Sequence, residues 1–143
     1  MCIIINLFKN MKKVLFKEKY PVFTLDILKI KTDFTSVNEI ISYFQEKISD
    51  HPVAVFISIF DHFTHTKNLE TSGKGGEISS EILDAKNIVF CFGKELPTPL
   101  AMAVRPRSIG VAEFSDKFVI SFMETPNPAS TDTLKEWVNS VLK

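Results

Sequence analysis

The fold is decided by the stretch Val53-Ala54-Val55-Phe56-Ile57-Ser58-Ile59-Phe60, the most apolar run of its length between two polar segments. Successive side chains of an extended strand point to opposite faces. One face of this stretch then carries only Val and Ile, and the other carries Ala, Phe and Ser. A strand that is apolar on both faces is typical of the interior of a sheet covered on both sides. We therefore expect residues 53–60 to be an interior strand, with helices over one face and helices or a second subunit over the other.

A helix is predicted immediately before this strand. Ser36 and Glu39 have the spacing of a capping box, in which each side chain binds a free backbone N–H of the first turn. Asp50-His51-Pro52 ends the helix, because the residue before a proline avoids the helical conformation. One apolar stripe recurs between these points at helical spacing: Val37, Ile40, Ile41, Phe44 and Ile48.

The remaining segments predict a mixture of strands and helices. Strands are expected at 22–31, 87–92, 108–114 and 117–124, and shorter helical segments at 80–85 and 96–104. A last helix should begin near Ser130 or Thr131. The resulting order, β-α-β-β-α-β-β-α, predicts an α+β domain over residues 11–143, with a largely antiparallel or mixed sheet and helices on one face.

Composition excludes several classes of protein. The chain of 143 residues is 45% hydrophobic, and its 17 basic residues balance its 17 acidic ones. These values exclude a disordered chain and a basic nucleic-acid-binding tail, and no apolar run approaches the roughly 18 residues that span a bilayer. Two cysteines, Cys2 and Cys91, do not make a disulfide framework, which favours a reduced cytoplasmic protein. We expect residues 1–10 to be a disordered tail or an extension from gene calling, outside the fold.

Histidine gives the first candidate site, in Asp61-His62-Phe63-Thr64-His65. Imidazole titrates near neutral pH and is a common metal ligand. His62 and His65 would point to opposite faces of a strand and could converge only in a turn. No third residue completes a set of ligands, so no metal-ligating set is assigned. Three alternatives stay open: a metal or haem ligand, a His62 oriented by Asp61 in a polar cleft, and a structural end to the strand.

Cys91 is the second candidate. It alternates with Phe90 and Phe92 in an apolar strand, which favours a buried small side chain. A catalytic thiol needs a neighbouring base. His62 could supply one if it ends an adjacent strand, so a redox or metal-dependent enzyme using His62, Asp61 and Cys91 is the alternative function.

Arg105 and Arg107 are the third candidate, and they are the only arginines among the 17 basic residues. Only a guanidinium offers a planar fork of donors that matches a carboxylate or phosphate. The pair flanks Pro106, which stiffens the turn. Either the arginines bind an anion or a partner, or they form an ion pair with Glu113 or Glu124. By contrast, Lys74-Gly75-Gly76 lacks the spacing of a phosphate-binding loop and predicts a flexible surface loop.

Three segments, in this order, resemble the family known as domain of unknown function 302. They are Phe60-Asp61-His62, then Ile88 to Gly93 followed by Pro97-Thr98-Pro99-Leu100-Ala101-Met102, and finally Ser121 to Pro126. The chain departs from the family at Lys94-Glu95, at Pro97 and at Arg107-Ser108-Ile109. The resemblance, to this family or a sister family of the same fold, implies a small α+β homodimer and no established activity.

These observations predict a small cytoplasmic domain that binds a small anionic molecule or a partner without catalysis. The expected cleft lies between the end of the 53–60 strand, with Asp61 and His62, the loop 66–80 and the turn that carries Arg105 and Arg107. His65 is a further candidate ligand-binding residue. A homodimer is expected, without nucleic acid or membrane as a partner, and no cofactor can be named. The alternatives are the metal, haem or redox enzyme above and a structural homodimeric assembly subunit.

Overall fold

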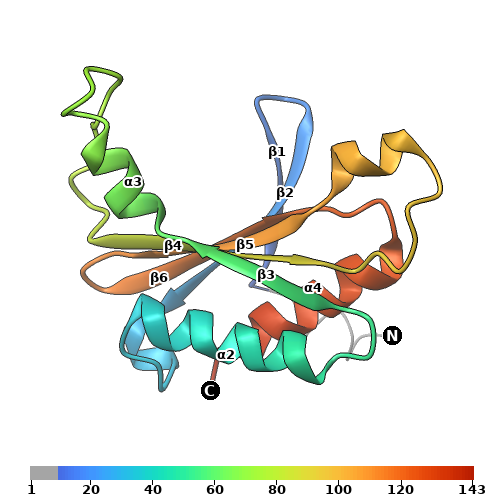
Figure 1. The fold of residues 1–143 in the computed structure, drawn as a ribbon. Coiled ribbons are helices and arrows are strands. Elements are labelled where there is room, and N and C mark those ends of the chain that lie inside the picture. Colours follow the sequence, from blue (N-terminus) through green and yellow to red (C-terminus); the bar gives the residue numbers. More distant parts are fainter. Residues whose placement is uncertain (1–9) are drawn as a thin grey trace.

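The computed structural model describes residues 10–143, which form a six-stranded antiparallel sheet with helices (Figure 1). The predicted tail 1–10 lies, apart from Asn10, outside the described residues. The strand order is β1-β2-β6-β5-β4-β3, so the chain crosses over between β2 and β3. The elements are β1 (Lys12–Phe16), β2 (Tyr20–Leu28), η1 (Lys29–Lys31), α2 (Val37–Asp50), β3 (Val55–Phe60), α3 (His62–Asn68), β4 (Asp84–Cys91), η2 (Pro99–Val104), β5 (Arg107–Glu113), β6 (Lys117–Met123) and α4 (Pro128–Asn139).

The hydrophobic core lies between one face of the sheet and the two long helices, α2 and α4 (Figure 1). The opposite face, here called the open face, carries no long helix; α3, η2 and the β1–β2 hairpin project on that side. This arrangement confirms the predicted α+β domain. No helix within residues 10–143 is long and apolar enough to cross a bilayer. Side chains that are at most 2% exposed fill the core: Leu25, Ile27, Val37, Ile40, Ile41, Phe44, Ile48, Ile88, Phe90, Ile109, Val111, Phe118, Ile120, Leu134, Val138 and Val141.

Helix α2 forms where its sequence predicts it. Ser36 is the N-cap, and its hydroxyl accepts a hydrogen bond from the Glu39 N–H at 3.1 Å. The Glu39 carboxylate in turn accepts one from the Thr35 N–H at 2.8 Å, one residue before the usual partner in a capping box. All five residues of the predicted apolar stripe are buried. The cap and the stripe together fix α2 across β4 and β5.

The expectation that residues 53–60 form an interior strand is wrong. Among the described residues, β3 lies at the edge of the sheet and pairs only with β4. Its side chains are correspondingly exposed, with Val55 at 63%, Ile57 at 51% and Ile59 at 44%. Alternation of apolar residues marks an extended strand, but it does not say whether a second neighbour exists. In this fold β5 and β6 occupy the centre of the sheet, because three consecutive antiparallel pairings place them between β2 and β4.

Several element boundaries also differ from the sequence prediction. Tyr20-Pro21 does not interrupt the sheet: β2 passes through it, and Pro21 pairs with Leu15 of β1, a strand the sequence did not reveal. Residues 62–68 form helix α3, and the segment at 80–85 leads into β4 without forming a helix. Helix α4 begins at Pro128 because Asn127 caps it. Lys74-Gly75-Gly76 lies in the connection between α3 and β4, where Lys74 and Gly75 are exposed and Gly76 is buried.

Candidate functional site

Both arginines line one cavity of about 350 Å³, which we call the arginine pocket. It lies at the end of the sheet where β4 and β6 finish and α4 begins. Four connections meet there: the turn after α2, the segment from β4 to η2, the turn from η2 into β5, and the segment from β6 to α4. The lining side chains are His51, Val53, Phe92, Gly93, Ala101, Val104, Arg105, Arg107, Thr125, Pro126, Asn127, Ala129, Ser130 and Thr133.

Arg107 is anchored in this pocket by backbone carbonyl groups. Its guanidinium donates hydrogen bonds to the carbonyl oxygens of Val104 at 3.0 Å, Met123 at 3.0 Å and Glu124 at 2.8 Å. Burial lowers the pKa of the Arg107 guanidinium, because the charged form loses hydration there. The three carbonyl groups fix the position of the charge without neutralising it.

Arg105 is held close to the backbone of the neighbouring segment. Its guanidinium donates to the Glu95 carbonyl oxygen, and it lies directly over Gly93. A Cβ atom on Gly93 would come within 2.3 Å of the Arg105 Cζ atom, so any larger residue would displace the guanidinium. Gly93 is therefore a positioning residue for Arg105. The Arg105–Pro106 peptide bond is cis.

Neither arginine forms an ion pair within residues 10–143. The two carboxylates considered as partners are occupied by lysines: Glu113 contacts Lys29 at 2.7 Å, and Glu124 contacts Lys13 at 2.8 Å. Among the lining side chains of the described chain there is no carboxylate. Among the described residues, the two positive charges of the arginine pocket have no negative partner, in a partly buried position where an unpaired charge is costly.

Helix α4 adds to the positive potential of the pocket. The Asn127 side chain caps the helix, accepting a hydrogen bond from the Ala129 N–H at 3.0 Å. Ser130 in the first turn and Thr133 in the second line the cavity. The N-terminus of a helix carries a partial positive charge, so this end of α4 favours a bound anion together with the arginines.

His51 closes the apolar side of the pocket. Its Nδ1 atom accepts hydrogen bonds from the Val53 and Ala54 N–H groups, both at 3.0 Å. A nitrogen that accepts two hydrogen bonds carries no proton, so the proton is on Nε2, which is left as a donor. The ring makes edge contacts with Phe92 and Trp137, at centroid distances of 5.4 and 5.8 Å. His51 was predicted only as the end of a helix.

His62 lies in a different hollow, of about 540 Å³, on the open face beneath α3. Its Nδ1 atom lies 3.2 Å from Oδ1 of Asn87, an oxygen that can only accept, so Nδ1 carries the proton. Asp61 does not orient His62. Its carboxylate caps α3 by accepting the Thr64 N–H at 3.1 Å, and this bond lowers the pKa of Asp61.

The predicted cleft between His62 and the arginines is not formed. His62 contacts Asn87 of β4, whereas Arg107 pairs in the sheet with Phe90, three positions along the same strand. Phe90 points into the core, so Asn87 points to the open face. His62 and Arg107 therefore lie on opposite faces of the sheet.

Cys91 and His65 also lack the predicted partners. Cys91 lies four residues beyond Asn87, about 13 Å along the strand at 3.3 Å per residue, and its Sγ atom accepts the Gly93 N–H at 3.3 Å. His65 packs against the Phe60 ring, as His62 does. Within residues 10–143 no three His, Cys, Asp or Glu side chains are grouped as a metal site would require. The structure does not bring His62, Asp61 and Cys91 together.

Sequence reasoning found the two arginines and missed the groups around them. The scarcity of arginine singled out Arg105 and Arg107. No comparable signal marks His51, Gly93 or Asn127, since each is read locally as the end of a helix, the end of a strand or a turn. These residues come together only through the pairing of distant strands.

A family model described as "Family of unknown function (DUF6858)" matches residues 11–143. This family is not domain of unknown function 302. The match therefore identifies a domain of unknown function and does not support the resemblance to domain of unknown function 302. That the two families share a fold stays a prediction. No curated protein and no solved structure matches the chain.

Proposed function

The chain belongs to the family of unknown function DUF6858, so its function has to be inferred from its own geometry, and we propose that it binds a small organic anion in the arginine pocket without changing it chemically. The observation that carries this proposal is the pair of guanidinium groups that face a cavity of about 350 Å³ with no carboxylate among the described lining residues. An anion would supply the missing negative charge.

The lining indicates which kind of anion fits. Arg105, Arg107 and the first turn of α4 make a polar end suited to a planar oxyanion, because a guanidinium can bind both oxygens of a carboxylate. Val104, Phe92 and other apolar side chains form the rest of the wall. A carboxylate with a short apolar or aromatic body matches both parts, and the volume lies at the lower end of the range for small-molecule sites.

The hydrogen bonds of two potentially reactive side chains, His51 and Cys91, support binding without catalysis. The acceptor nitrogen of His51 is occupied by two backbone N–H groups, which removes it as a general base. Cys91 accepts a backbone hydrogen bond and does not line the described pocket. Within residues 10–143 Cys91 forms no disulfide, which supports a reducing compartment such as the cytoplasm.

A homodimer is a further part of the proposal. The described residues leave many large apolar side chains exposed, including Phe16 at 56% and Leu100 at 78%. Exposed apolar patches of this kind mark interaction sites on soluble proteins. The anion-binding proposal does not depend on the oligomeric state, because all the lining groups named above come from one chain.

Benzoate is expected to bind the full chain more tightly than its neutral analogue benzamide does. At about 0.5 kcal/mol per non-hydrogen atom, benzoate should have a Kd on the order of 0.1–1 mM. Loss of the charged hydrogen bonds should weaken benzamide at least about 10-fold. Fluorescence of Trp137, the single tryptophan, reports on the pocket because its ring stacks on Phe92. Equal affinity for the two compounds, or no response to either, contradicts the proposal.

A further inference from the structure

The outer edge of β3 has no partner in the described chain. β3 is the strand at one edge of the sheet. Within residues 10–143, no loop or turn forms a backbone hydrogen bond with Val55–Phe60. An edge strand presents a row of free N–H and C=O groups, and natural proteins protect such edges with charges or prolines. β1, the other edge, carries Lys12 and Lys13. β3 reads Val-Phe-Ile-Ser-Ile-Phe, with neither charge nor proline.

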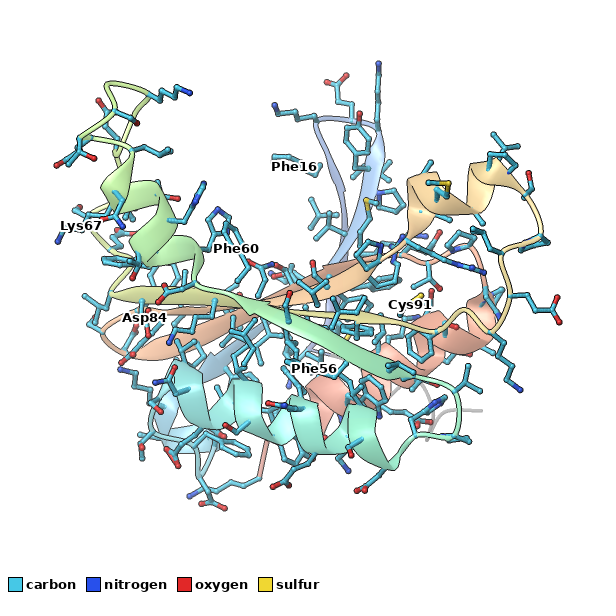
Figure 2. All side chains as sticks on the ribbon, in the orientation of Figure 1. Phe16, Phe56, Phe60, Lys67, Asp84 and Cys91 are labelled. Carbon is cyan, nitrogen blue, oxygen red and sulfur yellow. The ribbon has the colours of Figure 1, made fainter. Side chains whose placement is uncertain are left out.

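The direction of each β3 side chain follows from its pairing with β4, since paired residues point to the same face. Phe56 pairs with Phe90 and Ile59 with Ile88, and both β4 residues lie in the core. A bulge between Phe56 and Ser58 adds Ile57 to the strand without its own partner. The helix side of β3 therefore carries Phe56 and Ile59, and the open side carries Val55, Ser58 and Phe60. In Figure 2, Phe60 lies above the sheet and Phe56 below it.

We propose that two copies of the chain join β3 to β3 in antiparallel fashion, about a two-fold axis between Ile57 and Ser58, so that one sheet runs through both subunits. In this register Val55 lies opposite Phe60 of the partner subunit, Phe56 opposite the partner's Ile59, and Ile57 opposite the partner's Ser58. The first pair lies on the open side of both copies, and the second lies on the helix side of both. The bulge is what makes this possible, because an unbulged strand of the same length would place Val55 and Phe60 on opposite faces.

A second copy of the chain fits this edge because β3 is complementary to itself in the antiparallel register. The pairs outside the bulge join aliphatic to aromatic side chains, a favourable combination across antiparallel strands. Because β3 carries no charged residue, pairing about the two-fold axis brings no like charges together. Pairing of β3 with the β1 edge of another copy would instead set Lys12 and Lys13 against an apolar strand.

The area available also suits a dimer of moderate affinity. Val55, Ile57, Ile59 and Phe60 are 37–63% exposed. Together with the backbone edge, these side chains would bury on the order of 1,000 Å² in total over both copies, the lower limit for a specific interface. The proposal names the interface of the homodimer proposed above, on which it rests, and it is independent of anion binding.

Sedimentation velocity of the full chain over a range of concentrations tests the proposal, with Ile57→Lys as the disrupting variant. Lysine at this position would place two ammonium groups close to the two-fold axis, which should weaken the dimer at least about 10-fold. Val55→Lys, at the most exposed position of β3, repeats the test if Ile57→Lys fails to fold. The matched control is Val14→Lys in β1, because Val14 is an exposed residue of the other edge strand.

We expect wild type and Val14→Lys to form dimers at the same concentration, and Ile57→Lys to stay monomeric there with unchanged circular dichroism. If Val14→Lys disrupts the dimer and Ile57→Lys does not, the homodimer stands and the β3 interface is wrong. If wild type is monomeric at every concentration, both the homodimer and its interface are wrong.

Discussion

Arg107→Met is expected to weaken benzoate binding about 10- to 100-fold and to lower the free energy of unfolding by about 2 kcal/mol. Both effects have the same origin, because the guanidinium supplies a charge to the pocket and donates three hydrogen bonds to the backbone at the ends of β6 and η2. Methionine keeps the apolar stem and removes the donors. Trp137 fluorescence measures the affinity, and urea unfolding measures the stability.

Arg105→Met should separate the effect on benzoate binding from the effect on stability. Arg105 donates to one exposed carbonyl group, so its replacement should weaken benzoate similarly while changing stability by less than about 0.5 kcal/mol. Lys74→Met is the matched control, because it removes one positive charge from the connection between α3 and β4 and leaves the pocket intact. If Lys74→Met weakens binding as much as the arginine variants, only net charge matters and the pocket is not the site.

Phe90→Ala is expected to lower the free energy of unfolding by about 3–5 kcal/mol, the usual range for a buried phenylalanine. Phe90 is fully buried and makes edge contacts with Phe92 at 5.7 Å and Trp137 at 6.1 Å. Truncation would leave a cavity at the point where β4 meets α4, directly behind the arginine pocket. Because a domain of this size is stabilised by roughly 5–15 kcal/mol, much of its stability would be lost.

Phe16→Ala is the control for this truncation. It makes the same chemical change in β1, where the ring is 56% exposed and lies away from the core (Figure 2). The expected change is within about 0.5 kcal/mol by urea unfolding. Equal losses in the two variants would contradict the placement of Phe90 in the core and of Phe16 outside it.

The local parts of the fold could be predicted from the sequence, and the order of the strands could not. Helix α2 was found because Ser36 and the apolar stripe are signals within one segment. β3 was recognised as a strand for the same reason. Its position at the edge depends on which strands pair with β4 and β6, and Val55-Phe56-Ile57 contains no information on that choice. Helix α3 was missed because Asp61, read as a partner for His62, is its N-cap.

Likewise, only part of the candidate site could be predicted from the sequence. Arg105 and Arg107 could be chosen from the sequence, since they are rare and close together. Their surroundings could not, because His51, Gly93 and Asn127 reach the pocket from three separate connections. The predicted link to His62 failed for a geometric reason: one additional residue along a strand changes the face on which a side chain lies, and the sequence did not give the pairing register.

A crystal structure of the wild-type chain with benzoate is the sharpest test of anion binding in the arginine pocket. We expect the benzoate carboxylate within hydrogen-bonding distance of the Arg105 and Arg107 guanidinium groups, with the benzoate ring against Phe92 and Val104. Benzoate bound instead beside His62 and Asn87 on the open face, or no bound benzoate at saturating concentration, would contradict this expectation.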